Sequence, residues 1–211
     1  MVFCLFFTLS IACFAEPLPK EQLYQKLDLE QRGLSKKAFD LAVRGFEKLL
    51  AQGQLMNSTV LSIVDFSLPS SQKRLFVINL ISQELIFYDY VAHGKNSGTT
   101  IAKSFSNKMN SLKSSLGFFV TKNTYNGKNG LSLELDGKEK GINDHALERS
   151  VVIHGARYVN ENFATQKYGM GRSWGCPAVP EKINKSLIET IKDGSCFFIY
   201  APVYKKESAS L

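Results

Sequence analysis

Short apolar runs rich in β-branched and aromatic residues dominate the sequence from residue 60 onward. Runs of about four to eight such residues, separated by polar turns, are typical of β-strands. Strands are predicted at 60–66, 74–81, 85–92, 117–122, 131–135, 151–153 and 196–200, with a helix at 180–192. Because the strands are many and follow no regular repeat, the pattern predicts a mainly β fold, a sandwich or barrel with peripheral helices.

The segment before these strands has a helical period instead. Apolar residues from Leu23 to Leu50 recur at three- and four-residue steps, which places them on one helix face. Ser35 is suited to cap the N-terminus of the second half of this stretch. We therefore expect a helical lead-in at residues 16–58, a main domain at 59–204 and a frayed tail at 205–211.

The first fifteen residues form a separate apolar segment. The run from Val2 to Ala15 is shorter than the roughly twenty residues that a membrane-spanning helix needs, so no stable membrane span is expected. Small residues precede Glu16, which predicts a signal peptide cleaved after Ala15 and export to the periplasm or cell envelope. No Lys or Arg precedes the run, and two alternatives stay open: lipidation at Cys13, or a buried N-terminal helix.

Composition excludes several functional classes. The 211 residues are 44% hydrophobic and 21% charged, enough apolar residues for a sizeable core. The net charge of +7 comes from scattered Lys and Arg, which indicates a solvated basic surface and no nucleic-acid site. The dispersed His and Cys residues lack the short ligand pairs of metal sites, and no glycine-rich phosphate loop precedes a helix, so neither metal nor cofactor is expected.

Two segments carry residues suited to nucleophilic chemistry. His154 follows the predicted strand at 151–153, and Cys176 lies in a Gly-Cys-Pro turn. A thiol reacts as thiolate and needs a nearby base, which a histidine held at a strand end supplies. Gly175 permits a tight turn and close approach of a substrate. The backbone amides of Gly175 and Cys176 are candidates for an oxyanion hole.

The order of residues around Cys176 adds a family resemblance. A histidine, a spacer, then Ser-x-Gly-Cys resembles the L,D-transpeptidase catalytic domain family (YkuD-like), here matched by His154, Ser173, Gly175 and Cys176. The segments "VVIHGA" and "GRSWGCPAVP" are similar to its murein L,D-transpeptidase catalytic domain branch, and the likeness runs from about Leu75 to Ala201.

The resemblance implies the fold and a reaction. Cys176 would take an acyl group from a peptidoglycan stem peptide at its L,D-bond and form a thioester. His154 would be the general base and acid, oriented by a backbone carbonyl. Transfer to an amine makes the protein an L,D-transpeptidase, whereas transfer to water makes it an L,D-carboxypeptidase.

Other residues of these segments complete the expected site. Trp174 stands where the family usually has a second histidine, and we interpret it as a stacking wall for substrate. Pro177 follows the cysteine where Arg or Asn is common, and Arg172 could supply positive charge instead. Ser173, Gly155 and His93 are further candidates for the substrate or oxyanion site, although His93 could equally bond a loop. A disulfide between Cys176 and Cys196, in a non-catalytic wall-binding protein, is the remaining alternative.

Overall fold

The computed structural model of the protein describes residues 19–166 and 169–204. The predictions of a signal peptide at 1–15 and a tail at 205–211 lie outside these residues. Among the described residues, no helix combines the length and apolarity required to span a membrane. The elements in chain order are α1 (Lys20–Lys26), α2 (Lys36–Ala51), β1 (Val60–Asp65), β2 (Leu75–Asn79), β3 (Glu84–Asp89), β4 (Gly117–Gly127), β5 (Gly130–Gly137), β6 (Val152–Ala156), α3 (Glu161–Ala164), β7 (Ala178–Pro180), α4 (Glu181–Ile191) and β8 (Cys196–Tyr200).

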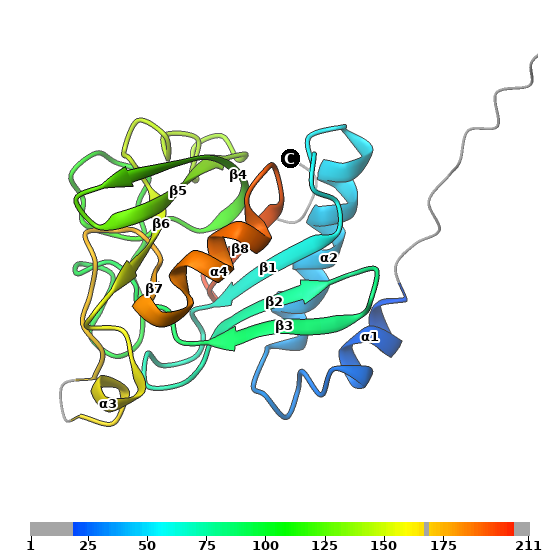
Figure 1. Ribbon diagram of the computed structural model, residues 1–211, viewed down its shortest axis with the longest axis horizontal. Helices are drawn as coiled ribbons and strands as arrows, with labels where there is room; N and C mark the ends of the chain where they lie inside the picture. Colours follow the sequence, from blue (N-terminus) through cyan, green and yellow to red (C-terminus); the bar gives the residue numbers. More distant parts are fainter. Residues whose placement is uncertain (1–18, 167–168, 205–211) are drawn as a thin grey trace, which may run out of the picture.

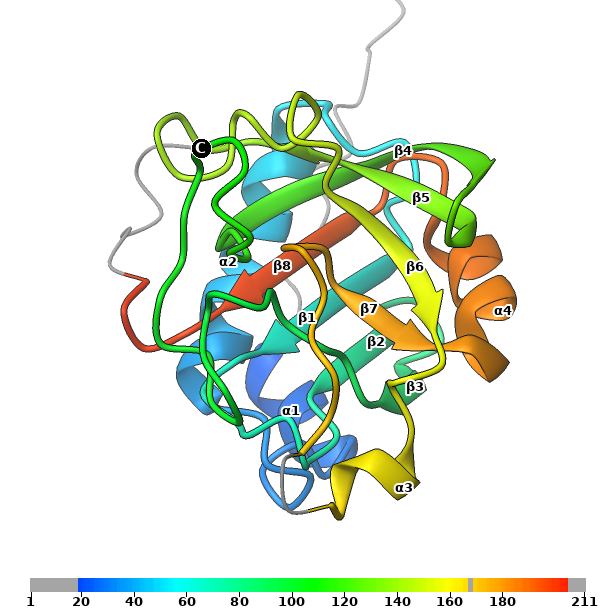
Figure 2. The ribbon, with the colours of Figure 1, turned by 90° about the vertical axis from the view of Figure 1, so that its left-hand side faces the viewer.

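The strands form one mixed sheet in the order β3-β2-β1-β8-β4-β5-β6-β7. β1 runs parallel to β8 and β6 parallel to β7, while the other neighbours are antiparallel. The sheet curls so far that its two ends nearly meet (Figures 1 and 2). The amide of Ala92, just beyond β3, donates to the carbonyl of Ala178 on β7 at 2.8 Å. The predicted mainly β fold with peripheral helices is confirmed, as a nearly closed barrel.

The core lies around the central strands. Every residue of β1 and β8 is buried, as expected for strands covered on both faces. α2 packs against both strands and runs behind β1 in Figure 1. A side chain at Gly45 on α2 would collide with the Phe118 ring, since an added Cβ would lie 2.0 Å from Phe118 Cζ. Phe118 in turn stacks on Phe198 with ring centroids 4.2 Å apart.

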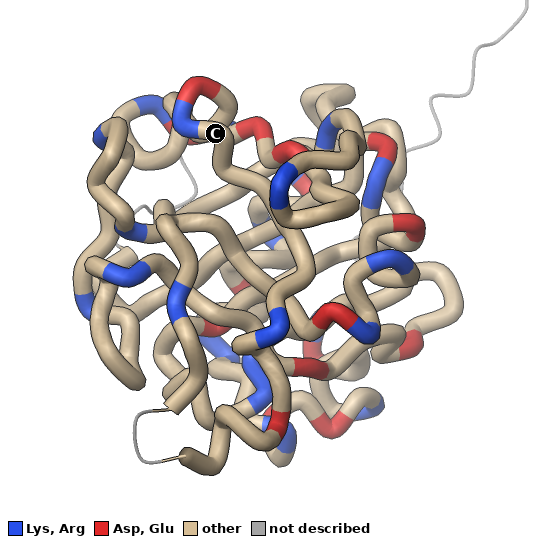
Figure 3. The backbone as a smooth tube through the Cα atoms, turned by 60° about the vertical axis from the view of Figure 1, so that its left-hand side comes forward, with Lys and Arg blue, Asp and Glu red and all other residues tan. Residues whose placement is uncertain are grey.

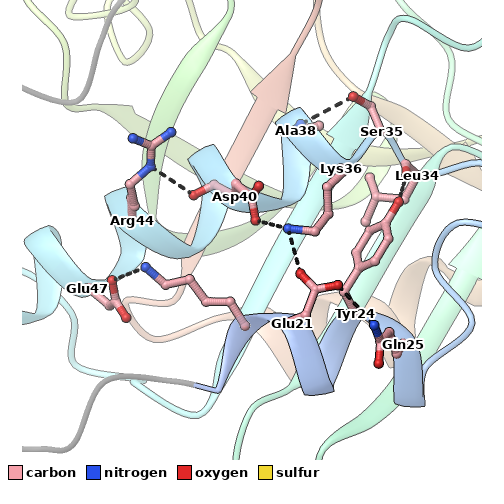
Figure 4. A network of polar contacts seen from close by, with 11 residues as sticks. Glu21, Tyr24, Gln25, Leu34, Ser35, Lys36, Ala38, Asp40, Arg44 and Glu47 are labelled. Carbon is pink, nitrogen blue, oxygen red and sulfur yellow. Dashed lines mark hydrogen bonds and ion pairs between the residues drawn. The ribbon is translucent and has the colours of Figure 1, made fainter.

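The helical lead-in divides into two helices joined by a turn. Ser35 caps α2 as predicted, its hydroxyl accepting from the Ala38 amide at 3.4 Å. Lys36 contacts Asp40 at 2.7 Å on its own helix and Glu21 of α1 at 3.2 Å (Figure 4). Tyr24 of α1 donates its hydroxyl proton to the Leu34 carbonyl at 2.5 Å. These contacts attach α1 to α2, and through α2 to the sheet.

Three elements near the site differ from the predictions. β6 continues through the histidine to Ala156, so His154 lies within the strand and not at its end. β7 was not predicted, because its three residues end in Pro180 and lead directly into α4. The short helix α3 was also missed, since four residues give no helical period. Figure 2 shows β7 beside β6. On its other side, Ala178 of β7 forms the bridge to Ala92.

Candidate active site

His154 projects from β6 and is 5% exposed. Its Nδ1 lies 2.9 Å from the Gly155 carbonyl oxygen. A carbonyl only accepts hydrogen bonds, so Nδ1 carries the proton and Nε2 of the neutral ring keeps its lone pair. Burial lowers the pKa of His154 below its ordinary value, despite the Gly155 hydrogen bond. The ring is therefore neutral at neutral pH, with Nε2 available as a base.

Cys176 lies on the loop that enters β7, beside the first residues of β6. His154 pairs with Ala178 in the parallel register, so Cys176, two residues earlier, lies level with Val152. Its side chain is half-buried, and Sγ donates to the Ser150 carbonyl at 3.6 Å. No hydrogen bond joins Cys176 to His154 in the described structure. The two predicted catalytic residues are thus on adjacent backbone segments, with the thiol hydrogen held by Ser150.

The Cys176 thiol is protonated in this arrangement. Burial raises the pKa of the Cys176 thiol above its ordinary value, and this effect exceeds the opposing effects of the Val152 amide and the Arg149 guanidinium. A neutral histidine and a neutral thiol form a pair in which the base must take the proton during the reaction. The site is arranged for general-base activation more than for a preformed ion pair.

Ser173 orders the Gly175–Cys176 turn from within. Its hydroxyl donates to the Cys176 carbonyl at 2.5 Å and accepts from the Gly175 amide at 3.1 Å. Gly175 has a φ of +132°, and a Cβ there would lie 2.9 Å from the Lys113 carbonyl oxygen, so only glycine fits. Ser173 is 4% exposed and serves the turn more than the substrate.

The hydrogen bonds of Ser173 affect which backbone amides could form an oxyanion hole. The Gly175 N–H is occupied by Ser173, contrary to its expected role as an oxyanion donor. The amides of Trp174 and Cys176 donate to no oxygen atom of the described residues. Neither amide therefore has an oxygen acceptor among the described residues, although the Cys176 amide also lies near its own thiol and lowers the thiol pKa.

His93 lies inside the fold, with both ring nitrogens in hydrogen bonds. It is fully buried, and its Nδ1 lies 2.8 Å from Arg74 Nη2 while its Nε2 lies 3.2 Å from the Gly98 carbonyl oxygen. Arginine only donates and a carbonyl only accepts, so the proton is on Nε2 and both ring nitrogens are engaged. Burial, then the Arg74 charge, lowers the pKa of His93 to about 4. Of the two roles considered for His93, the structure supports the loop contact, since no part of the ring is open to substrate.

The other predicted residues border the loop on its solvent side. Trp174 is 77% exposed, although it is the one tryptophan of the chain. Arg172 is exposed and donates to the Gly98 carbonyl at 3.2 Å. Figure 3 shows Lys and Arg spread over several loops, without a continuous stripe. The surface thus resembles the solvated basic surface that the composition indicates.

Sequence reasoning missed Arg149 and Ser114. Ser114 links the two sides of the closure: its hydroxyl donates to the Gly175 carbonyl at 3.1 Å and accepts from the Gly94 amide at 2.9 Å. Arg149 Nη2 lies 3.6 Å from the position of a Cβ on Gly175. The position of Arg149 close before the strand of His154 was a signal that could have found it. No local pattern indicated Ser114.

Cys176 and Cys196 are both free, so the alternative disulfide is not formed. Cys196 is buried on β8, where burial raises the pKa of its thiol. In residues 19–166 and 169–204, no three His, Cys, Asp or Glu side chains gather as metal ligands would.

Comparison with known proteins gives the family. A family model described as "L,D-transpeptidase catalytic domain" matches residues 30–200, which extends the likeness upstream of Leu75 to include α2. A search of the curated proteins found no match.

Solved structures similar to the chain include an L,D-transpeptidase from Mycobacterium smegmatis, at 13% identity and TM-score 0.42 over 68% of this chain and 59% of that one. Another is the helical cell shape determining protein Pgp2 from Campylobacter jejuni, at 10% identity and TM-score 0.43 over 71% and 49%. The chain spans less than two thirds of either protein. Since the family model covers most of the sequence, the chain belongs to the L,D-transpeptidase catalytic domain family.

Proposed function

We propose that the protein is an exported cysteine acyltransferase that acts on peptidoglycan stem peptides. The observation that carries the proposal is the His154 ring, whose Nδ1 is held by the Gly155 carbonyl while Nε2 remains a base on the strand beside Cys176. Family membership supplies the substrate class.

In the first half-reaction, His154 Nε2 takes the proton from Cys176 Sγ. The sulfur attacks the carbonyl carbon of the scissile L,D-bond, and the carbonyl oxygen becomes an oxyanion. The Trp174 and Cys176 amides are the backbone donors that would stabilise it. The carbon–nitrogen bond then breaks, and His154 returns the proton to the leaving amine. A thioester on Cys176 and the released D-amino acid are the products.

The second half-reaction uses the same groups in reverse. An amine of another stem peptide, or water, loses a proton to His154 and attacks the thioester carbonyl. The sulfur leaves and regains its proton. An amine acceptor forms a crosslink and water forms a shortened stem. A small pocket of about 210 Å³ is lined in part by Ser150, whose carbonyl contacts Cys176 Sγ, although neither Cys176 nor His154 lines it.

The exposed Trp174 is proposed to stack on the substrate. A large apolar side chain that is 77% exposed on the nucleophile loop is available for contact with a ligand. Arg172, also exposed, would contribute positive charge near acidic groups of the stem peptide. Cell-wall substrate also requires export, which residues 1–15 would direct. Intact mass measurement of protein secreted from cells checks this, since cleavage after Ala15 leaves Glu16 as the first residue.

The test uses purified protein and muropeptides with tetrapeptide stems. We expect mass spectrometry to detect an acyl adduct on Cys176, with either crosslinked dimers or shortened stems as products. Cys176→Ala removes the adduct and all turnover, whereas Cys196→Ala, the matched control at the buried thiol, retains both. Full activity in Cys176→Ala contradicts the proposal and returns the protein to the class of non-catalytic wall-binding proteins.

A further inference from the structure

Arg149 occupies a rigid turn immediately before β6. The Ser150 amide donates to the Leu147 carbonyl at 2.9 Å, and the Val151 amide to the Ala146 carbonyl at 2.9 Å. This is the pair of bonds that ends a helix in a Schellman motif, with Ser150 in the left-handed position at φ 52°. The backbone of Arg149 is therefore held in place one residue before the carbonyl that contacts Cys176 Sγ.

The guanidinium of Arg149 contacts neutral groups. Its Nη1 donates to the Ser106 carbonyl at 2.7 Å and to the Ser115 hydroxyl. Its Nη2 donates to the Lys113 carbonyl at 2.8 Å and to the Ser111 hydroxyl at 3.3 Å. No carboxylate of the described residues forms an ion pair with it, although the side chain is half-buried. Keeping an unneutralised charge partly out of water is unfavourable, so its position calls for an explanation.

The charge lies against the turn that carries the nucleophile. Nη2 is 3.6 Å from the position of a Cβ on Gly175, and the Lys113 carbonyl that Nη2 contacts is 2.9 Å from the same point. Each Nη atom has two hydrogens, and all four are used by the loop at 106–115. The two-pronged end of the side chain is thus not free to bind a substrate carboxylate.

We propose that Arg149 is a positioning residue for Cys176, which braces the loop at 106–115 against the Gly175 turn and places a fixed positive charge beside the nucleophilic sulfur. The inference rests on the proposed function of Cys176. A cation near a thiol favours the thiolate, so Arg149 opposes the effect of burial on the Cys176 pKa.

Other charged and titratable groups around Cys176 do not supply this fixed charge. His154 on β6 is neutral, because burial lowers its pKa. Burial, then the charge of Cys176, raises the pKa of Tyr158 to about 12, so it is also neutral. Glu134 on β5 lines the neighbouring pocket and carries the opposite sign. Lys113 directs its ammonium group to the Ser104 hydroxyl at 2.7 Å, and Arg172 is exposed beside Gly98.

The experiment measures the rate of Cys176 alkylation by iodoacetamide against pH, in a Cys196→Ala background. We expect Arg149→Gln to raise the apparent pKa of alkylation by about 0.5–1 unit, which slows alkylation about three- to tenfold below that pKa. Arg149→Lys keeps the charge and is expected to stay within about 0.3 unit of the parent protein. Arg44→Gln on α2 is the matched control for loss of an exposed cation outside the site, and leaves the pKa unchanged.

A second variant separates charge from bracing. Ser111→Ala removes one contact of Arg149 but leaves its charge, so the pKa of alkylation is expected to be unchanged. An unchanged pKa in Arg149→Gln, or an equal shift in Ser111→Ala, overturns the inference. If Arg149→Gln does not fold, Arg149→Lys decides: a shift of a full unit contradicts the inference.

The two proposals fail separately. Muropeptide turnover that survives Cys176→Ala removes the proposed function, whatever the alkylation data show. Turnover that requires Cys176 but an alkylation pKa that ignores Arg149 removes only the inference about Arg149.

Discussion

His93 and His154 occur in nearly the same local sequence and have different environments. Each follows an apolar pair and precedes a glycine, in Val91-Ala92-His93-Gly94 and Val152-Ile153-His154-Gly155. His93 has a donor on one ring nitrogen and an acceptor on the other, whereas His154 has one partner and a second nitrogen without one among the described residues. The two rings differ in whether one nitrogen is left without a partner, and this difference cannot be read from the local sequence. Our proposal that His154 is the base rests on it.

The largest expected effect separates the two histidines by activity. His154→Gln removes the base and is expected to lower turnover by about 10²–10⁴-fold, the usual contribution of a general base. His93→Gln keeps an acceptor for Arg74 and is expected to retain turnover per folded molecule within about threefold. Steady-state kinetics on muropeptides measure both. Equal losses in the two variants would contradict the assignment of His154 as the base.

The next effect concerns stability, where we expect His93 to matter more than His154. His93→Leu removes one of the two acceptors of the fully buried Arg74 Nη2 and leaves the Val91 carbonyl as the other, and we expect a loss of about 1–3 kcal/mol in the free energy of unfolding. The matched His93→Gln variant should recover part of this loss. Urea titrations followed by circular dichroism provide the values. A His93→Leu protein as stable as the parent would show that the Arg74–His93 contact contributes nothing.

A pH titration of stability sharpens the comparison further. The pKa of His93 is about 4 in the folded protein against 6.5 as its ordinary value, so only the unfolded chain binds a proton between these limits. Stability from His93 is therefore complete above pH 6.5 and falls by up to about 1.4 kcal/mol per pH unit as the pH drops toward 4. Because His154 also has a lowered pKa, the contribution of His93 is the difference between parent and His93→Gln curves. Parallel stability curves for the parent and His93→Gln would contradict the expected contribution of His93.

The glycines that follow the two histidines provide the smallest contrast. A Cβ on Gly94 would lie 2.7 Å from the Leu112 carbonyl and 2.9 Å from Gly175 Cα, both backbone atoms. A Cβ on Gly155 would meet Asn184 Cβ at 3.1 Å, a milder contact. We expect Gly94→Ala to cost about 1 kcal/mol more than Gly155→Ala, within the usual range for overpacking. Thermal unfolding of the two variants tests the order, and the reverse order would show that β6 tolerates less change than the closure loop.

The sequence by itself determined most of the secondary-structure elements and the family. Strand patterns of β-branched residues located seven of the eight strands in the described part of the chain, because residue pattern and run length are local properties. The motif around Cys176 identified the family before any coordinates, since serine, glycine and cysteine in that order meet a local steric and hydrogen-bonding requirement. Ser35 as the cap of α2 is a further local prediction that the structure confirms.

Tertiary structure alone decided which groups surround Cys176. The near closure of the sheet brings Gly94, Lys113 and Gly175 together, although they are far apart in the chain. It also places the Arg149 charge against the Gly175 turn and leaves the Trp174 and Cys176 amides without an oxygen acceptor among the described residues. These facts depend on two long-range bridges from the segment after β3, one from Ala92 to Ala178 of β7 and one from Gly94 to Ser173. A local sequence pattern records the preferences of each segment, whereas burial, charge and unused hydrogen-bond donors arise only when the segments meet.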